Sequence, residues 1–201
     1  GHVLAEGHEV HAVTRNPERI EETNPNLHLH ALDLENVAGP ERLARALGKL
    51  PVDILINNAG VLIDDDGIAD LKTADVRQSF EVNTLIPVRV CQALLPFLKP
   101  GARVVQITSL MGSIGDNASG GNYSYRMSKA ALNMFNKSFA IERPDLIALA
   151  LHPGWVKTEM GGSQAPTSVN ESVAGMLRLI SKATLVDSGK FFDYEGDELP
   201  W

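Results

Sequence analysis

Short apolar runs alternate with helical patterns along almost the whole chain, and this alternation limits the possible folds most strongly. The apolar runs have the length of strands and span residues 9–14, 27–32, 52–56, 103–107, 146–151 and 190–194. Helical patterns lie between them, at residues 38–49, 74–98, 122–143 and 169–182. Strands that alternate with helices at this spacing pair in parallel. We therefore predict an α/β fold with a doubly wound, mostly parallel sheet that is covered by helices on both faces.

The composition is that of one globular domain. With 201 residues and 44% hydrophobic content, the chain is long enough for one sizeable core, so we predict a single domain over residues 1–201. The net charge of −7 argues against nucleic acid or an anionic membrane as a partner. No run approaches the roughly 18 apolar residues that cross a membrane, and the single cysteine, Cys91, cannot form a disulfide within the chain. We expect a soluble, cytoplasmic protein.

Residues 106–133 combine the end of a strand, a loop rich in Gly, Ser and Asn, and the start of a helix. Tyr125 and Lys129 lie four residues apart on that helix, so their side chains share one face. A nearby ammonium group favours the phenolate, and the positive end of the helix dipole acts in the same direction. We therefore predict that the pKa of Tyr125 is lowered. Ser109, at the tip of the preceding strand, could direct its hydroxyl at the same substrate oxygen.

The carboxyl ends of the predicted strands are polar or carry glycine. In an open α/β sheet, ligands bind beyond these ends. Here they are Thr14-Arg15, Asp33, Asn57-Asn58-Ala59-Gly60, Thr108-Ser109 and His152-Pro153-Gly154. The sequence thus predicts a polar, ligand-binding crevice along one rim of the sheet.

The order of these features resembles the short-chain dehydrogenase/reductase family, and the resemblance covers nearly the whole chain. It rests on the strand that ends in Ser109, the glycine loop, and the Tyr-x-x-x-Lys pair on the following helix. Finer details are similar to the small carbonyl reductases, a branch that includes sniffer-like and C-factor-like proteins. They are the segments 120–126 and 151–162 and the ending Pro200-Trp201.

The resemblance implies a Rossmann-like domain that reduces an aldehyde or ketone to an alcohol, or catalyses the reverse oxidation. Tyr125 would donate the proton, Lys129 would lower its pKa and hold the nicotinamide ribose, and Ser109 would position the substrate oxygen. Asn83 would hold a relay water through its carbonyl. Proline has no N–H, so Pro87 deprives that carbonyl of its helical partner and disrupts the helix. The alternative for Asn83 is a kink that serves packing alone.

The resemblance also implies an NADP site, with NAD as the alternative. The residues implied as cofactor contacts are Arg15, Asp33, Asn57, Asn58, Ala59, Gly60, Tyr125, Lys129, Pro153, Gly154, Val156 and Thr158. NAD-dependent dehydrogenases usually place an acidic residue at the end of the second strand of their sheet, where it binds the ribose 2′-hydroxyl. That strand corresponds to residues 9–14 here, because the family's first strand is absent from residues 1–201. Here Thr14 and Arg15 stand at that point, and a guanidinium suits a 2′-phosphate. Arg15 could equally be a solvated surface charge.

The family's glycine-rich fingerprint and the strand before it are absent from residues 1–201. We expect the natural protein to carry an apolar strand and a glycine-rich turn upstream of Gly1. The absence favours a rival interpretation, in which the chain is a catalytically silent module that uses this fold for binding or regulation. The intact set of Ser109, Tyr125 and Lys129 argues against that rival.

Two further features bear on metals and on assembly. His28 and His30 share one face of a predicted strand, as metal ligands sometimes do, but a third ligand is not evident. The acidic run at residues 64–67 is typical of a turn or solvated loop, and we predict no metal site. The long apolar helices at residues 74–98 and 122–143 predict a homodimer by analogy with the family.

Overall fold

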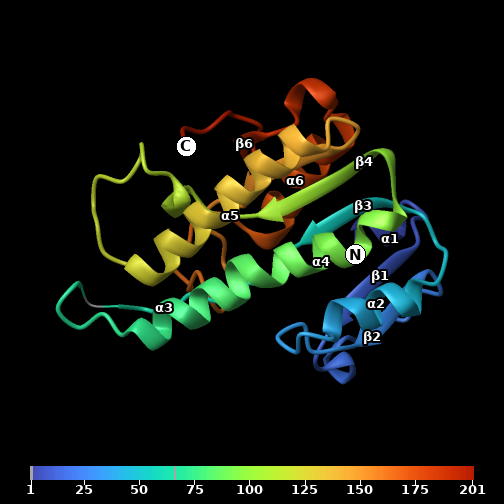
Figure 1. The fold of residues 1–201 in the computed structure, drawn as a ribbon, viewed down its shortest axis with the longest axis horizontal. Coiled ribbons are helices and arrows are strands. Elements are labelled where there is room, and N and C mark those ends of the chain that lie inside the picture. Colours follow the sequence, from blue (N-terminus) through green and yellow to red (C-terminus); the bar gives the residue numbers. More distant parts are fainter. Residues whose placement is uncertain (1, 66) are drawn as a thin grey trace. The chain divides into compact units, whose positions relative to one another are not determined.

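The computed structural model describes residues 2–65 and 67–201 (Figure 1). Gly1 and Asp66, the latter in the acidic run predicted as a turn or solvated loop, lie outside the described residues. The chain divides into two compact units, an N-terminal unit (Gly1–Leu50) and a C-terminal unit (Pro51–Trp201). Across the described residues, no helix combines the length and the apolar character needed to cross a membrane.

The N-terminal unit contains a two-stranded parallel sheet. Its elements are α1 (His2–Ala5), β1 (Val10–Thr14), η1 (Pro17–Arg19), β2 (Leu27–Ala31) and α2 (Gly39–Leu47). The pairing of β1 with β2 runs in register from Val10 opposite Leu27 to Thr14 opposite Ala31. Pro40 lies in the first turn of α2, where its missing N–H leaves no helical bond unmade.

The C-terminal unit is built on a four-stranded parallel sheet. The strands are β3 (Val52–Asn57), β4 (Leu98–Ile107), β5 (Ile147–His152) and β6 (Lys190–Asp193), side by side in that order. All of β5 except its last residue is buried. A strand that is buried on both faces carries a continuous apolar run rather than an alternating one. This explains the sequence from Ile147 to Leu151 and confirms the predicted parallel strands.

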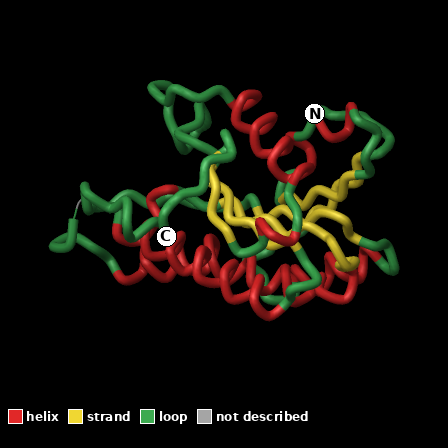
Figure 2. The backbone as a smooth tube through the Cα atoms, turned by 90° about the horizontal axis from the view of Figure 1, so that it is seen from above, coloured by secondary structure: helices red, strands yellow, loops and turns green. Residues whose placement is uncertain are grey.

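Helices cover both faces of the four-stranded sheet. On β4, Val105 and Ile107 pack in the apolar cluster that contains Met176 and Ile180 of α6 (Val169–Lys182). The alternate residue Gln106 contacts Cys91 on the opposite side. Figure 2 shows the helices lying along the strands. The predicted doubly wound arrangement is therefore confirmed for this unit.

The helix predicted at residues 74–98 is interrupted. It consists of α3 (Thr73–Phe80), a π-helical turn η2 (Glu81–Leu85), α4 (Ile86–Leu94) and a short 3-10 turn η3 (Leu95–Phe97). Figure 1 shows α3 and α4 as one continuous rod. In η2 the Ile86 N–H donates to the carbonyl of Glu81, five residues earlier. The predicted disruption near Pro87 is thus found as a π turn, and Leu98 already belongs to β4.

The two sheets are separate. Among the described residues, β1 pairs only with β2, and β3 pairs only with β4.

Candidate active site

The structure brings Ser109, Tyr125 and Lys129 together at the carboxyl end of β4. Ser109 follows this strand and caps the short turn η4 (Leu110–Gly112), its Oγ accepting a hydrogen bond from Met111 N at 3.1 Å. Tyr125 and Lys129 lie in the first two turns of α5 (Tyr123–Glu142). A hydrogen bond joins the side chains of Tyr125 and Ser109. The Lys129 Nζ lies 5.7 Å from the centre of the Tyr125 ring.

The predicted lowering of the pKa of Tyr125 is not found. Burial raises the pKa of Tyr125, since only 7% of the residue is exposed and the phenolate would lose most of its solvation. The hydrogen bond with Ser109 acts in the opposite direction but is the smaller effect. Tyr125 therefore carries its proton at neutral pH.

Lys129 is a buried cation in this structure. Only 3% of the residue is exposed, and its Nζ donates to the Ile107 carbonyl oxygen at 2.9 Å. Burial lowers the pKa of Lys129 to about 8. Its nearest described hydrogen-bond acceptor is thus the end of β4, not the Tyr125 hydroxyl, which is a second reason why the predicted effect on Tyr125 is absent.

Asn83 joins the loop after β3 to α5. Its Oδ1 accepts from Val61 N at 2.8 Å, and its Nδ2 donates to Val61 O and to Ser128 Oγ, both at 2.9 Å. A Cβ added to Gly60 would lie 3.2 Å from Asn83 Oδ1 and 3.5 Å from Lys129 Nζ. Gly60 therefore borders both the Asn83 side chain and the Lys129 ammonium group. The relay role of the Asn83 carbonyl stays a prediction.

The other residues of the Asn57–Gly60 segment differ in their surroundings. Asn57 is buried and its Nδ2 donates to Gln106 Oε1 at 3.0 Å and to Cys91 Sγ at 3.4 Å. These bonds join β3 to the neighbouring strand and to α4. Asn58 and Ala59 are exposed beyond the strand end, where a ligand can reach them.

The segment after β5 forms a tight, hydrogen-bonded turn on the strand adjacent to β4. Gly154 has a positive φ of 83°, and a Cβ at this position would lie 2.8 Å from the Tyr194 ring, so only glycine fits. Ser172 Oγ donates to Pro153 O at 2.6 Å. The Thr158 hydroxyl accepts from Gly161 N at 3.0 Å, and Val156 forms a bridge with Thr167.

The two predicted cofactor residues of the N-terminal unit contact Glu35. Arg15 lies beyond β1, is largely exposed, and forms an ion pair with Glu35 at 3.2 Å. Asp33 Oδ1 accepts from Glu35 N at 3.0 Å, just after β2. Both residues belong to the N-terminal unit, whereas Tyr125 belongs to the C-terminal unit.

Sequence reasoning missed two residues that position the site. Asp65 was assigned to a turn or solvated loop, but its carboxylate accepts from Tyr123 N at 2.8 Å and Ser124 N at 2.9 Å. It therefore caps α5 at the turn that holds Tyr125. Ser128, fully buried, donates to Tyr125 O at 2.8 Å and accepts from Asn83. The contacts of Asp65 and the contact of Ser128 with Asn83 join residues that are distant in sequence, and the contact of Ser128 with Tyr125 lies inside one helix. No local sequence pattern therefore predicts them.

A model of the short chain dehydrogenase family matches residues 2–168. The chain belongs to this family. The C-signal of Myxococcus xanthus is 50% identical over 155 residues, which cover 75% of this chain and 93% of that protein.

Solved structures of similar proteins include two carbonyl reductases. The carbonyl reductase Sniffer of D. melanogaster has a TM-score of 0.88 and 31% identity, and the match covers 95% of this chain and 86% of that one. An NADPH-bound carbonyl reductase from chicken fatty liver has a TM-score of 0.89 and 33% identity, covering 96% and 87%. This short-chain dehydrogenase therefore has the Rossmann-like fold of an NAD(P)-dependent oxidoreductase family, as the sequence predicted.

Proposed function

We propose that this short-chain dehydrogenase reduces an aldehyde or ketone to an alcohol with NADPH, or catalyses the reverse oxidation with NADP. The observation that carries the proposal is the buried Tyr125 hydroxyl, hydrogen-bonded to Ser109 and flanked by Lys129. A general acid must hold its proton at the working pH and lie beside the group that receives it.

The raised pKa of Tyr125 keeps the phenol protonated, so the residue has a proton to give to a carbonyl oxygen. As the carbonyl becomes an alcohol, its oxygen gains negative charge, which a neutral phenol can neutralise by giving up its proton. The Ser109 hydroxyl, bonded to Tyr125 in this structure, can donate a hydrogen bond to the same oxygen and hold it in place.

The residues around Lys129 fit a nicotinamide cofactor, which supplies or accepts the hydride when it is bound. The ammonium group can donate three hydrogen bonds, and the described contacts include one acceptor, Ile107 O. Gly60 leaves open the space beside the Lys129 Nζ that a side chain would enter. We infer that Lys129 holds the ribose of the cofactor. NADP as the cofactor is supported by the NADPH-bound carbonyl reductase, which is 33% identical.

The remaining cofactor contacts are proposed from their positions at strand ends. Asn57, Asn58, Ala59 and Gly60 follow β3, and Pro153, Gly154, Val156 and Thr158 follow β5. In open α/β sheets these are the positions where dinucleotides bind. Arg15 and Asp33 follow β1 and β2 in the same way, and we propose that they contact the 2′-phosphate and the adenine.

Replacement of Tyr125 by Phe tests the proposed reaction. Tyr125→Phe removes the proton donor and keeps the ring, so NADPH consumption with an aldehyde or ketone should fall by about 10²–10⁴-fold or more. Tyr123→Phe, on the same helix, is the matched control and should retain activity. Near-normal turnover by Tyr125→Phe would show that another group supplies the proton.

A second candidate function is a catalytically silent binding or signalling module. The observation that favours it is the 50% identity to a relative whose name, C-signal, describes a signal and not an enzyme. The two functions differ in a direct readout. A silent module would show no NADPH consumption with any aldehyde, ketone or quinone, and Tyr125→Phe would leave its binding properties unchanged.

We further propose a homodimer through the outer face of α5. Met127, Met134 and Ile141 lie seven residues apart on this helix and are 39%, 67% and 72% exposed. Apolar side chains at this spacing form one stripe, which a second copy of the helix can cover in an isologous contact. Sedimentation analysis should show a dimer, and Met134→Glu should convert it to a monomer. A monomeric wild-type protein at micromolar concentration would contradict the proposal.

A further inference from the structure

Four titratable side chains gather on one face of the two-stranded sheet in the N-terminal unit. The parallel register sets His11 of β1 directly opposite His28 of β2. His30 lies two residues beyond His28, and Glu9 lies two residues before His11, so all four point to the same side of the sheet. Glu9 and His11 thus join His28 as candidate ligands that were not evident from the sequence.

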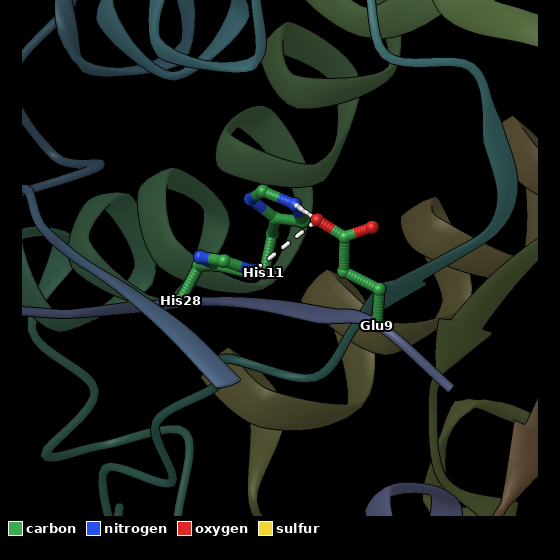
Figure 3. Close-up of side chains that lie close together, drawn as sticks. All are labelled: Glu9, His11 and His28. Carbon is green, nitrogen blue, oxygen red and sulfur yellow. Dashed lines mark hydrogen bonds and ion pairs between the residues drawn. The ribbon is translucent and has the colours of Figure 1, made fainter. Parts of the chain in front are cut away.

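The Glu9 carboxylate lies against both paired imidazoles (Figure 3). Its Oε1 is 3.2 Å from His11 Nε2 and 3.1 Å from His28 Nε2. All three candidate ligand atoms lie within 4.8 Å of one another. Two ligands of a tetrahedral ion at bonds of about 2.0 Å stand roughly 3.3 Å apart. The carboxylate oxygen and each imidazole nitrogen already have this separation, so an ion can enter with small side-chain rotations.

His30 is placed to hold His11 in the form that binds a metal. The two rings stack at 5.2 Å between centroids, and His11 Nδ1 lies 2.9 Å from His30 Nε2. If His11 carries its proton on Nδ1 and donates it to His30, the lone pair of His11 Nε2 is free. Histidines that bind metals almost always donate their other ring N–H to such a partner, which fixes the ring.

Solvent can reach the cluster, so an ion and a completing water have access. The side chains of His28 and Glu9 are 45% and 55% exposed, while that of His11 is 22% exposed. Two imidazoles and one carboxylate suit Zn²⁺ and neighbouring transition metals, whereas Mg²⁺ and Ca²⁺ prefer oxygen ligands alone.

We propose that Glu9, His11 and His28 bind one divalent transition-metal ion of the Zn²⁺ class, with His30 as the hydrogen-bonding partner of His11. The ion would connect β1 to β2 at opposed positions. The site lies within the N-terminal unit, shares no residue with the proposed active site, and does not depend on the proposed function.

The test is calorimetric titration of the chelator-treated, full-length chain with Zn²⁺, and with Mg²⁺ as the comparison ion. Wild type should bind one Zn²⁺ per chain and no Mg²⁺. Co²⁺, as a spectroscopic probe, should give the intense visible absorption of a four-coordinate site. His28→Phe keeps the aromatic stack on His11 but removes the ligand, so its Zn²⁺ affinity should fall by more than the 10- to 100-fold loss typical of a partner residue.

Three further variants distinguish a specific metal site from nonspecific binding of Zn²⁺ by histidine side chains. His30→Phe should weaken Zn²⁺ about 10- to 100-fold, as expected for a positioning residue. Glu9→Gln lies just before β1 and leaves the rings in place, so it reports on the site even where His28→Phe fails to fold. His8→Gln is the matched control, because His8 forms an exposed pair with Glu6 at 3.5 Å and, within the part of the chain that the structure describes, belongs to no larger group of candidate metal ligands.

Each result decides the proposal. Saturable binding that is lost in Glu9→Gln or His28→Phe and kept in His8→Gln supports the site. No saturable Zn²⁺ binding by wild type would overturn it. Equal affinities of wild type, Glu9→Gln and folded His28→Phe would also overturn it, since the ion would then be bound elsewhere.

Discussion

Burial of the Lys129 ammonium group predicts a specific dependence of stability on pH. A lysine pKa that drops from 10.5 to about 8 on folding means that the folded state disfavours the charged form. At about 1.4 kcal/mol per pKa unit, this costs on the order of 3 kcal/mol of folding free energy at neutral pH. Between pH 8 and 10.5 the unfolded chain binds more protons than the folded chain, so stability rises with pH in this window.

The perturbation that isolates this effect is Lys129→Met, which keeps an unbranched side chain and removes the charge. The linkage relation gives the size of the effect: from pH 7 to pH 9.5, the wild type should gain about 2 kcal/mol of unfolding free energy relative to Lys129→Met. The loss of the bond to Ile107 O shifts the variant by a constant amount and leaves this pH-dependent difference unchanged.

Urea unfolding of the cofactor-free protein at several pH values provides the assay. Trp155 and Trp201 are the two tryptophans of the chain and both lie in the C-terminal unit, so their fluorescence reports on the unit that holds Lys129. Lys182→Met is the control, because Lys182 is exposed and stays in water in both states. A wild-type-to-variant difference that stays constant from pH 7 to pH 9.5 would refute the reasoning.

Three other substitutions test residues that position the candidate active site or that are proposed to bind the cofactor. Asp65→Asn removes the charge that caps α5, so it should lower stability by about 0.5–2 kcal/mol, measured by urea unfolding. Although burial alone would raise it, the hydrogen bonds from the backbone of α5 lower the pKa of Asp65, so this contribution should be present above pH 3.8 and vanish as the pH falls further. Gly112→Ala puts a Cβ 2.8 Å from the Lys129 backbone carbon, and the overpacking should cost about 1–3 kcal/mol and reduce NADPH turnover; wild-type values for both would contradict the close approach. Arg15→Ala should weaken NADPH by about ten- to a hundredfold and NADH much less, because a charge-assisted bond to the 2′-phosphate is worth roughly 1.5–3 kcal/mol. Equal losses for both cofactors by calorimetry would remove Arg15 from the phosphate site.

The sequence predicted the elements of the fold well because their signals are local. The buried run from Ile147 to Leu151, and the helix at residues 169–182, follow from apolar content and periodicity within a few residues. Ser109, Tyr125 and Lys129 were found because a strand end and a four-residue helical spacing define their positions. The single domain, the cytoplasmic location and the dimer stay predictions.

The parts that sequence reasoning missed depend on contacts between distant residues or on burial. Asp65 reaches Tyr123 across 58 positions, and no composition rule links the two. The cluster of Glu9, His11, His28 and His30 depends on the register of β1 against β2, because the register decides whether His11 or its neighbour lies opposite His28. The pKa of Tyr125 was predicted with the wrong sign because residue spacing shows a nearby charge but not the loss of solvent.

The π turn at Glu81–Leu85 amounts to an α-helix that contains one additional residue. Deleting a single residue here would restore ordinary helical bonding but turn the two ends of the rod relative to each other by about 100°. If Ile86, Val90 and Leu94 kept their places against the sheet, Ser79 and the whole of α3 would swing away from α5. The residues of α4 that pack in the core and the residues of α3 near the candidate site therefore differ in their angular position around the helix axis. The extra residue in the π turn, which contains Asn83, brings both sets to the correct side. A chain of this design can lose its site chemistry by a single in-frame codon deletion while keeping an intact core, and an insertion could restore it.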